Sequence, residues 1–361
     1  MSRAKELHGI EIVKVADKGL GMGYHEGKVI FVERSVPGDV VDVRTYKNKK
    51  NFSMAYPLEF QKLSEQRITP FCRHFGTCGG CKWQNLPYSV QLEHKQQLVG
   101  DALQRIMGIT GVEVEPVIPA DPERFYRNKL EYTFSNRKWL TLEEMESEEE
   151  LPRDGLGFHI PRQFDKVLDV FECFLQPAPS DAIRNFVREF VLKHQIPFFD
   201  LKAQTGVLRN LIIRNNLKSE FLIILAITEK FEQLEMLMQE LTAKFPQITS
   251  MNYVINTKGN STINDLEIQN YSGQNHLIEE LGSIKYRIGP KSFFQTNATQ
   301  AEVLYDLVRK HADINKEDLV YDLYTGLGSI ALYVADLCKR LVGIEWVEDS
   351  VADAKVNAKL N

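Results

Sequence analysis

The stretch LVYDLYTGLGSI, residues 319–330, decides the fold of the carboxyl-terminal part of the chain. The apolar residues from Leu319 to Tyr324 predict a buried strand of the parallel type. Gly326 and Gly328 follow directly and predict a tight turn into a helix that begins near Ser329. Glycines at the carboxyl end of a strand let a ligand approach the backbone, so the stretch predicts a strand, a ligand-binding turn and a helix.

The next predicted strand, LVGIEW at 341–346, contains an acidic residue, Glu345, near its carboxyl end. A carboxylate about 20 positions after the glycine turn suits the hydroxyl groups of a ribose. The chain has one Gly-x-Gly and no Gly-x-x-x-x-Gly-Lys-Ser/Thr, which disfavours a triphosphate and leaves the dinucleotide fingerprint incomplete. S-adenosylmethionine is therefore the favoured cofactor, with Gly326, Gly328 and Glu345 as binding residues.

Four of the five cysteines form a pattern that is typical of a metal site. Cys72, Cys78 and Cys81 lie in CRHFGTCGGC, and Cys173 lies far downstream in DVFECFLQP. This spacing favours four thiolate ligands of an iron–sulfur cluster. Structural zinc is the alternative, although zinc sites usually pair two Cys-x2-Cys units. A radical S-adenosylmethionine enzyme is disfavoured, because it would need Cys-x3-Cys-x2-Cys and an iron without a protein ligand.

Composition places the chain among ordinary globular proteins. It has 361 residues and a formal net charge of −5, and six acidic residues are concentrated in the run 143–150, which predicts a solvated loop. The first residues show no signal or transit peptide, and the longest apolar stretch, FLIILAI at 221–227, is far shorter than a membrane helix. We therefore expect a cytoplasmic protein with reduced thiols and no membrane segment.

The amino-terminal part predicts a small β-barrel. Short alternating runs separated by glycines extend from Ile10 to about Pro70. Between two of the runs lies a basic cluster with interleaved aromatic rings. Its cations could hold phosphates and its rings could stack on bases, whereas the alternative is an ordinary exposed hairpin. The cluster consists of Arg44, Lys47, Lys49 and Lys50, with Tyr46 and Phe52.

The middle of the chain predicts an α+β layer. An amphipathic helix follows Asn85 and Pro87 and ends near Gly108, and strands and helices then continue to about residue 283. Regular alternation of strand and helix begins only after residue 284. Five basic residues of this layer could hold RNA phosphates, although most surface arginines have no such role: Arg124, Arg127, Lys129, Arg209 and Arg214.

With these residues considered together, the chain resembles the RNA 5-methyluridine methyltransferases, most closely the 23S ribosomal RNA (uracil-5-)-methyltransferase branch. The resemblance covers nearly the whole chain and depends on four motifs in the family's order: CGGCKWQ at 78–84, YRNK at 126–129, SFFQTN at 292–297 and DLYTGLGSI at 322–330.

The resemblance implies three domains and two bound groups. These are a TRAM domain, an oligonucleotide-binding-like barrel, at 1–64; a central α+β RNA-binding domain at 65–283; and the start of a Rossmann-like S-adenosylmethionine-dependent domain at 284–361. It also implies a 4Fe-4S cluster on the four cysteines named above. Gln295, Tyr324 and Glu345 match positions where the family contacts S-adenosylmethionine, with Gly326 and Gly328 in the turn. The implied protein is a monomer that binds RNA, most readily 23S ribosomal RNA.

The family's reaction is methylation of uracil C5 after a cysteine thiolate has added to C6. The family's nucleophilic cysteine and general-base glutamate have no counterpart up to Asn361, so we expect a truncated, inactive chain with an incomplete carboxyl-terminal domain and no catalytic residue. Cys338 is spaced at seven, four and three residues from Ala331, Val334 and Ala335, which predicts a buried packing residue. The alternative function is a non-catalytic RNA-binding iron–sulfur protein that retains the cofactor fold.

Overall fold

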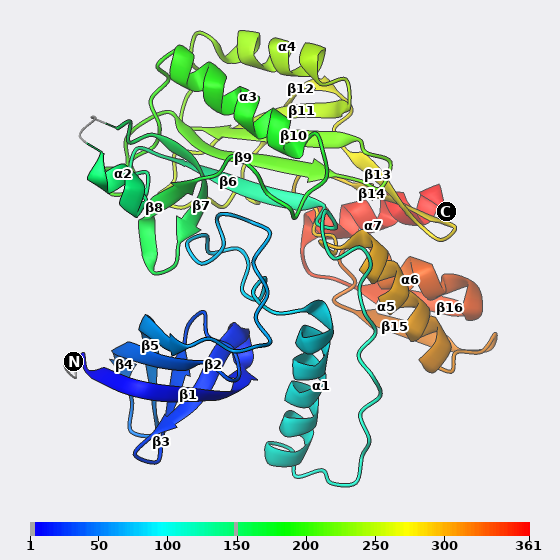
Figure 1. The fold of residues 1–361 in the computed structure, drawn as a ribbon. Coiled ribbons are helices and arrows are strands. Elements are labelled where there is room, and N and C mark those ends of the chain that lie inside the picture. Colours follow the sequence, from blue (N-terminus) through cyan, green and yellow to red (C-terminus); the bar gives the residue numbers. More distant parts are fainter. Residues whose placement is uncertain (1–3, 148–150) are drawn as a thin grey trace. The chain divides into compact units, whose positions relative to one another are not determined.

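The computed structural model describes residues 4–147 and 151–361 (Figure 1). The chain divides into two compact units, Met1–Pro119 and Ala120–Asn361, and each is described by itself. No helix in the described ranges is both long enough and apolar enough to cross a membrane.

The first unit contains a closed five-stranded barrel in the order β1-β2-β3-β5-β4. Alternating side chains point inward and form its core, which includes Ile10, Ile30, Val41 and Val43. The barrel predicted from the sequence is therefore confirmed. Its strands are β1 (Glu6–Ala16), β2 (Leu20–His25), β3 (Lys28–Val32), β4 (Val40–Asn48) and β5 (Phe52–Lys62), and the short helix η1 (Asp17–Gly19) joins the first two.

A buried carboxylate fixes the segment that follows the barrel. Asp39 is fully buried and accepts hydrogen bonds from the amides of Val36 at 2.7 Å and Ser64 at 2.9 Å. The guanidinium of Arg67 donates two more, at 2.8 and 2.6 Å. Because a buried charge is tolerated only when its lone pairs are satisfied, this network joins the chain after β5 to the barrel wall.

Helix α1 (Tyr88–Arg105) begins where the sequence predicts, directly after Pro87. It is held to β1 by an ion pair of 2.7 Å between Lys14 and Asp101. None of its residues is buried, and Ile106 and Met107 just beyond it are 84% and 64% exposed. The helix is confirmed, although its apolar residues are at most half-buried, with Val90 packed against a cluster of Val15, Val36 and Leu86.

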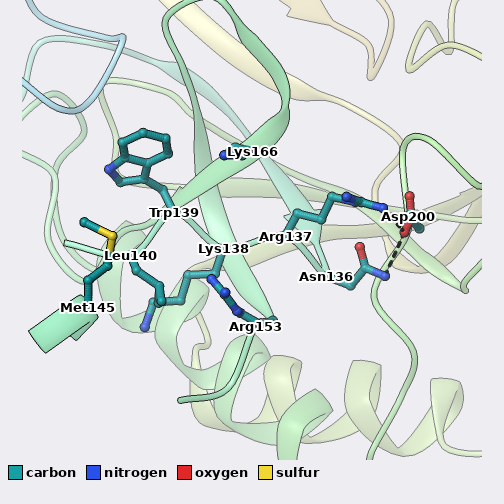
Figure 2. Close-up of a pocket in the computed structure, with 9 residues that line it drawn as sticks. All are labelled: Asn136, Arg137, Lys138, Trp139, Leu140, Met145, Arg153, Lys166 and Asp200. Carbon is teal, nitrogen blue, oxygen red and sulfur yellow. Dashed lines mark hydrogen bonds and ion pairs between the residues drawn. The ribbon is translucent and has the colours of Figure 1, made fainter. Parts of the chain in front are cut away.

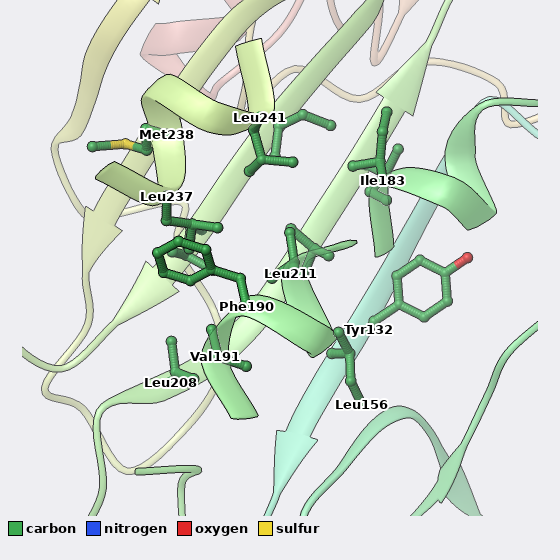
Figure 3. Packing of buried hydrophobic residues seen from close by; sticks show 14 of the residues in the cluster. Tyr132, Leu156, Ile183, Phe190, Val191, Leu208, Leu211, Leu237, Met238 and Leu241 are labelled. Atoms are coloured by element: carbon green, nitrogen blue, oxygen red, sulfur yellow. The ribbon is translucent and has the colours of Figure 1, made fainter. Parts of the chain in front are cut away.

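The second unit contains a mixed seven-stranded sheet in the order β12-β11-β10-β9-β6-β7-β8. Only β10 and β11 pair in parallel. Helices α3 and α4 cover one face (Figures 1 and 3). The strands are β6 (Lys129–Ser135), β7 (Gly155–Ile160), β8 (Gln163–Asp169), β9 (Leu208–Asn215), β10 (Phe221–Ile227), β11 (Ile248–Ile255) and β12 (Ile268–Gly273), and the helices are α3 (Ser180–Lys193) and α4 (Leu234–Lys244).

Apolar side chains on both faces explain the central position of β9 and β10. Every residue of these two strands is buried. Leu211, Ile223 and Leu225 belong to the cluster under the helices, whereas Leu222 and Ile224 belong to a cluster on the opposite face. Strands that are covered on both sides are continuously apolar, as FLIILAI is.

The chain then alternates strand and helix, as predicted from residue 284 onward. The elements are the hairpin β13 (Leu277–Leu281) and β14 (Ile284–Ile288), α5 (Ala298–His311), β15 (Leu319–Leu323), α6 (Ser329–Val334), η2 (Ala335–Leu337), β16 (Arg340–Ile344) and α7 (Glu348–Leu360). Strands β15 and β16 pair in parallel. The predicted burial of the strand at 319–324 is wrong: Leu319, Tyr321 and Leu323 are 49%, 57% and 61% exposed, because only one face of this two-stranded sheet is covered.

The acidic run is only partly a loop. Helix α2 (Leu142–Glu146) occupies its beginning, with a capping box between Thr141 and Glu144. Thr141 and Glu144 are three residues apart, which is the spacing of a capping box. The prediction of a solvated loop is therefore wrong for this part of the run. Residues 148–150, which complete the run, lie outside the described ranges.

Candidate functional site

The glycine turn adopts a backbone that ordinary residues avoid. Tyr324, Gly326 and Gly328 have φ values of 63°, 58° and 87°. The amide of Thr325 donates to the carbonyl of Ile344 at 3.0 Å, which joins the turn to the end of β16. Apart from its two chain neighbours, no residue in the described part of the chain has an atom within 4 Å of the position that a Cβ would take at Gly326. The turn therefore presents open backbone, as a ligand-binding turn requires.

The carboxylate of Asp322 holds the glycine turn against helix α6, which follows it. Asp322 Oδ2 accepts hydrogen bonds from Thr325 Oγ1 at 2.7 Å and from the amide of Ala331 at 3.1 Å. The end of β15, the turn and the first turn of α6 are thereby fixed to one another. Asp322 has a structural role in this geometry.

Glu345 lies at the same end of the parallel pair and bonds directly to the turn. Its Oε2 accepts from the amide of Gly326 at 3.0 Å, and its Oε1 accepts from the amides of Trp346 at 2.8 Å and Val347 at 2.9 Å. The amide of Val347, followed by those of Trp346 and Gly326, holds the pKa of Glu345 below its usual value. A carboxylate has about four lone-pair sites, so roughly one acceptor position is left for a hydroxyl group.

Two large aromatic side chains flank this contact. Tyr324 is 89% exposed and Trp346 is 87% exposed. Exposed rings next to a glycine turn and a carboxylate can stack on the flat face of a nucleoside base. Trp346 was not singled out in the sequence, although its position directly after Glu345 was the available signal.

The motif SFFQTN is fixed to the central sheet through its backbone. Arg214 Nη2 donates to the carbonyl of Ser292 at 2.8 Å. Asn128 donates from its side chain to the carbonyl of Gln295 and from its amide to the carbonyl of Thr296, both at 2.8 Å. The side chain of Gln295 itself is exposed. Two motifs that lie far apart in the sequence are therefore in contact, and Asn128 is a positioning residue that the sequence did not reveal.

Two of the five predicted phosphate ligands are wrong. Arg209 and Arg214 are 3% and 4% exposed. Arg209 donates to the carbonyls of Asn256 and Asn260 at 2.9 and 3.0 Å. Buried guanidinium groups that satisfy carbonyl oxygens support the fold and cannot reach RNA phosphates.

Three of the predicted cluster cysteines lie in one loop of the first unit. The amide of Cys78 donates to the carbonyl of His74 at 2.8 Å, and Cys78 Sγ accepts from the amide of Gly80 at 3.4 Å. Burial, with smaller effects of Cys81 and Cys72, raises the pKa of the Cys78 thiol to about 11. Three thiols in one loop are soft donors of the kind that an iron–sulfur cluster uses, so their chemistry fits a cluster.

Cys173 lies in the second unit, shortly after β8, and its amide donates to Asp181 at 2.9 Å. In the described ranges no group of three or more His, Cys, Asp or Glu residues has the arrangement of a metal site. The five cysteines form no disulfide there. The four-cysteine cluster therefore stays a prediction.

Cys338 is not the buried residue that its spacing predicted. The helix α6 ends at Val334, so Cys338 lies after η2, is half-buried, and places its Sγ 3.6 Å from the carbonyl of Ala335. Ala331 and Val334 are buried as expected, whereas Ala335 is exposed. The helical periodicity fails because the helix is shorter than the pattern assumed.

Comparison with known proteins identifies the family. The chain is 44% identical to an uncharacterized RNA methyltransferase of Bacteroides thetaiotaomicron over 352 residues, which covers 96% of this chain and 78% of the relative. A similar relative of Porphyromonas gingivalis is 43% identical over 359 residues, 98% of this chain and 77% of its own length. No protein-family model matches the chain.

A solved structure shows the same fold. It is the tRNA (uracil-54, C5)-methyltransferase of Pyrococcus abyssi in complex with S-adenosyl-L-homocysteine, with a TM-score of 0.71 and 25% identity, covering 98% of this chain and 76% of that one. Fold and sequence together define a methyltransferase. The chain belongs to the family of RNA methyltransferases. The predicted transferase class is confirmed, whereas the 23S branch, the TRAM domain and the iron–sulfur cluster stay predictions.

Proposed function

We propose that the protein methylates C5 of a uridine in RNA, with 23S ribosomal RNA as the substrate and S-adenosylmethionine as the methyl donor. The observation that carries this proposal is the contact of Glu345 with the amide of Gly326, which joins an acidic side chain to an open glycine turn. The chain that contains this arrangement belongs to the RNA methyltransferase family. It shares its fold with a tRNA (uracil-54, C5)-methyltransferase.

Five residues are proposed to bind the cofactor. Gly326 and Gly328 keep the turn free of side chains, and the open acceptor position of Glu345 takes a ribose hydroxyl. The side chains of Tyr324 and Gln295 are both exposed and contact the rest of the S-adenosylmethionine molecule. S-adenosylmethionine supplies an activated methyl group when it is bound. We assign the covalent nucleophile to no residue of this chain, Cys338 included.

The barrel supplies a surface that suits RNA. Lys47, Lys49 and Lys50 are exposed at the β4–β5 connection. Tyr46 and Tyr56 stack there with ring centroids 6.5 Å apart. Cations next to exposed rings are typical of surfaces that hold single-stranded nucleic acid, which supports the proposed TRAM function of residues 1–64.

We also propose that Cys72, Cys78, Cys81 and Cys173 hold a 4Fe-4S cluster. The spacing of the cysteines and the proximity of three thiols in one loop support this assignment. Anaerobically purified protein should be brown, with iron and sulfide in equal amounts. Colourless protein that contains zinc would instead identify a structural zinc site, and colourless protein without metal would refute both.

The substrate is tested with labelled S-adenosylmethionine and three unmodified RNAs: 23S ribosomal RNA, 16S ribosomal RNA and transfer RNA. The proposal expects the chain to bind S-adenosylmethionine and to retain 23S RNA more tightly than the other two. Preferential binding or methylation of transfer RNA would replace the proposed substrate. RNA binding without any affinity for S-adenosylmethionine would support a non-catalytic RNA-binding protein.

A further inference from the structure

The second unit contains a pocket that none of the predicted site residues line. Its volume is about 560 Å³, and it lies at the edge of the sheet next to β8 (Figure 2). We call it the β8 pocket. Nine residues line it: Asn136, Arg137, Lys138, Trp139, Leu140, Met145, Arg153, Lys166 and Asp200.

Backbone hydrogen bonds make the pocket part of the fold. The segment after β6 extends along the edge strand: the amide of Trp139 donates to the carbonyl of Val167 at 2.8 Å. On its other side, the amide of Lys138 donates to the carbonyl of Arg153 at 2.7 Å. These bonds fix the backbone from which the lining side chains project.

The lining has more cationic than acidic side chains. It contains four cationic side chains and one carboxylate. Arg137 pairs with Asp200 at 3.2 Å, and Lys138 pairs with Glu144 at 2.6 Å. Arg153 and Lys166 form no ion pair with any residue in the described part of the chain. Two cationic groups in one pocket that have no carboxylate partner among the described residues favour an anionic ligand.

Aromatic rings accompany these cations. The ammonium group of Lys166 lies 5.1 Å from the ring centre of the half-buried Trp139. Phe164 is two residues earlier on β8, hence on the same face of the strand, and is 66% exposed. Lys202 lies 5.9 Å from the centre of the Phe164 ring. Rings and cations therefore alternate along the edge of the sheet.

We propose that the β8 pocket binds a single-stranded segment of the RNA substrate. Arg153 and Lys166 hold backbone phosphates, and Trp139 stacks on a base. Phosphate groups alone would not require the rings, and an apolar ligand would not require the cations, whereas a nucleotide chain uses both. The inference rests on the proposed function, because it assigns a contact for the same RNA at a place away from the glycine turn.

The test is the affinity of the whole chain for a short fluorescein-labelled single-stranded RNA, followed by anisotropy. Trp139→Ala is expected to weaken binding by about 5- to 150-fold, the range for loss of one stacked base, whereas Trp139→Phe keeps most of the affinity. Lys166→Gln and Arg153→Gln should each weaken binding several-fold. Each should also lower the slope of log affinity against log salt by about 0.7, the value for one phosphate contact of a single strand.

Lys244→Gln is the matched control. Its ammonium group also lies over a ring, 4.6 Å from the centre of Phe186, but Lys244 does not line the pocket. RNA affinity should be unchanged in this variant. S-adenosylmethionine binding, measured in parallel, should be unchanged in every variant.

The outcomes separate the two proposals. Wild-type RNA affinity in Trp139→Ala and Lys166→Gln, with RNA binding intact in the wild type, overturns the pocket assignment and leaves the proposed function standing. Competition by uridine monophosphate as strong as that by the RNA would identify a mononucleotide site and also overturn the assignment. Absence of S-adenosylmethionine binding in the wild type would refute the proposed function itself.

Discussion

Replacing Glu345 by Gln tests the cofactor site most directly. The carboxylate of Glu345 accepts three backbone hydrogen bonds, from Gly326, Trp346 and Val347. A glutamine retains one acceptor oxygen, which can keep the pair of bonds to Trp346 and Val347. Its amide nitrogen would then face the amide of Gly326, two donors that cannot bond to each other. The turn should lose its connection to β16 through this side chain.

The expected magnitude follows from the single bond that is lost. A hydrogen bond to a charged acceptor contributes roughly 1.5–3 kcal/mol. Glu345 is only half-buried, so solvent screening places the value near the lower end. Because the cofactor binds the ordered turn, destabilising that turn by about 1.5 kcal/mol weakens the affinity for S-adenosylmethionine by up to about tenfold. The loss of the open acceptor position for a ribose hydroxyl adds to this effect.

Isothermal titration calorimetry of the whole chain with S-adenosylmethionine measures the change. Glu317→Gln is the control, because Glu317 is 82% exposed and only pairs with Lys339 at 3.2 Å on the surface. This control should bind like the wild type.

The pH dependence gives an independent check of the same contact. Because the pKa of Glu345 is lowered, its carboxylate stays ionised and holds the turn at every pH above its ordinary value of 4.5. The contribution of Glu345 to cofactor affinity should be constant there and should fall only as the pH drops through the lowered pKa. The reasoning is refuted if Glu345→Gln binds as tightly as the wild type, or if both proteins lose affinity in the same way at low pH.

The remaining predictions concern stability, measured by urea unfolding. Asp39→Asn should destabilise the protein by about 2–4 kcal/mol, because it breaks the charged network around a fully buried carboxylate. Asp265→Asn, at a side chain that is 67% exposed, should change little, and equal effects of the two changes would contradict this. Gly19→Ala should lower the free energy of unfolding by about 1–3 kcal/mol more than Gly27→Ala does. Both glycines have positive φ, but a Cβ at Gly19 would lie 2.1 Å from an indole nitrogen, whereas a Cβ at Gly27 would meet no described atom within 4 Å. Burial raises the pKa of Glu279 from 4.5 to about 7, so the folded state keeps a proton that the unfolded chain releases. The contribution of Glu279 to the free energy of unfolding should therefore fall by about 3 kcal/mol between these pH values, and Glu279→Gln should remove this contribution.

Local signals in the sequence predicted the secondary structure of the site well. The glycines at 326 and 328, which here have positive φ, identified the turn, and the spacing to Glu345 identified its partner at the end of the next parallel strand. Both signals act over short distances, where backbone sterics and strand geometry leave few alternatives.

Burial was predicted less well, because it depends on what covers an element. The apolar stretch at Leu319 predicted a strand covered on both faces, but one face of β15 is open. Arg209 and Arg214 resemble surface cations in the sequence, yet both are buried and bonded to carbonyl groups of distant segments. The spacing of apolar residues indicates which side chains share a face of a helix or strand. It does not indicate whether another element packs against that face.

The sequence by itself determined the small amino-terminal barrel, the alternation of strand and helix after residue 284 and the glycine turn with its acidic partner, because periodicity and backbone preference act between near neighbours. Only the tertiary structure decided that Asn128 fixes the backbone of the SFFQTN motif and that Trp139, Arg153 and Lys166 line one pocket. These residues are brought together by hydrogen bonds between segments far apart in the chain, and such contacts leave no periodic trace in the order of the amino acids.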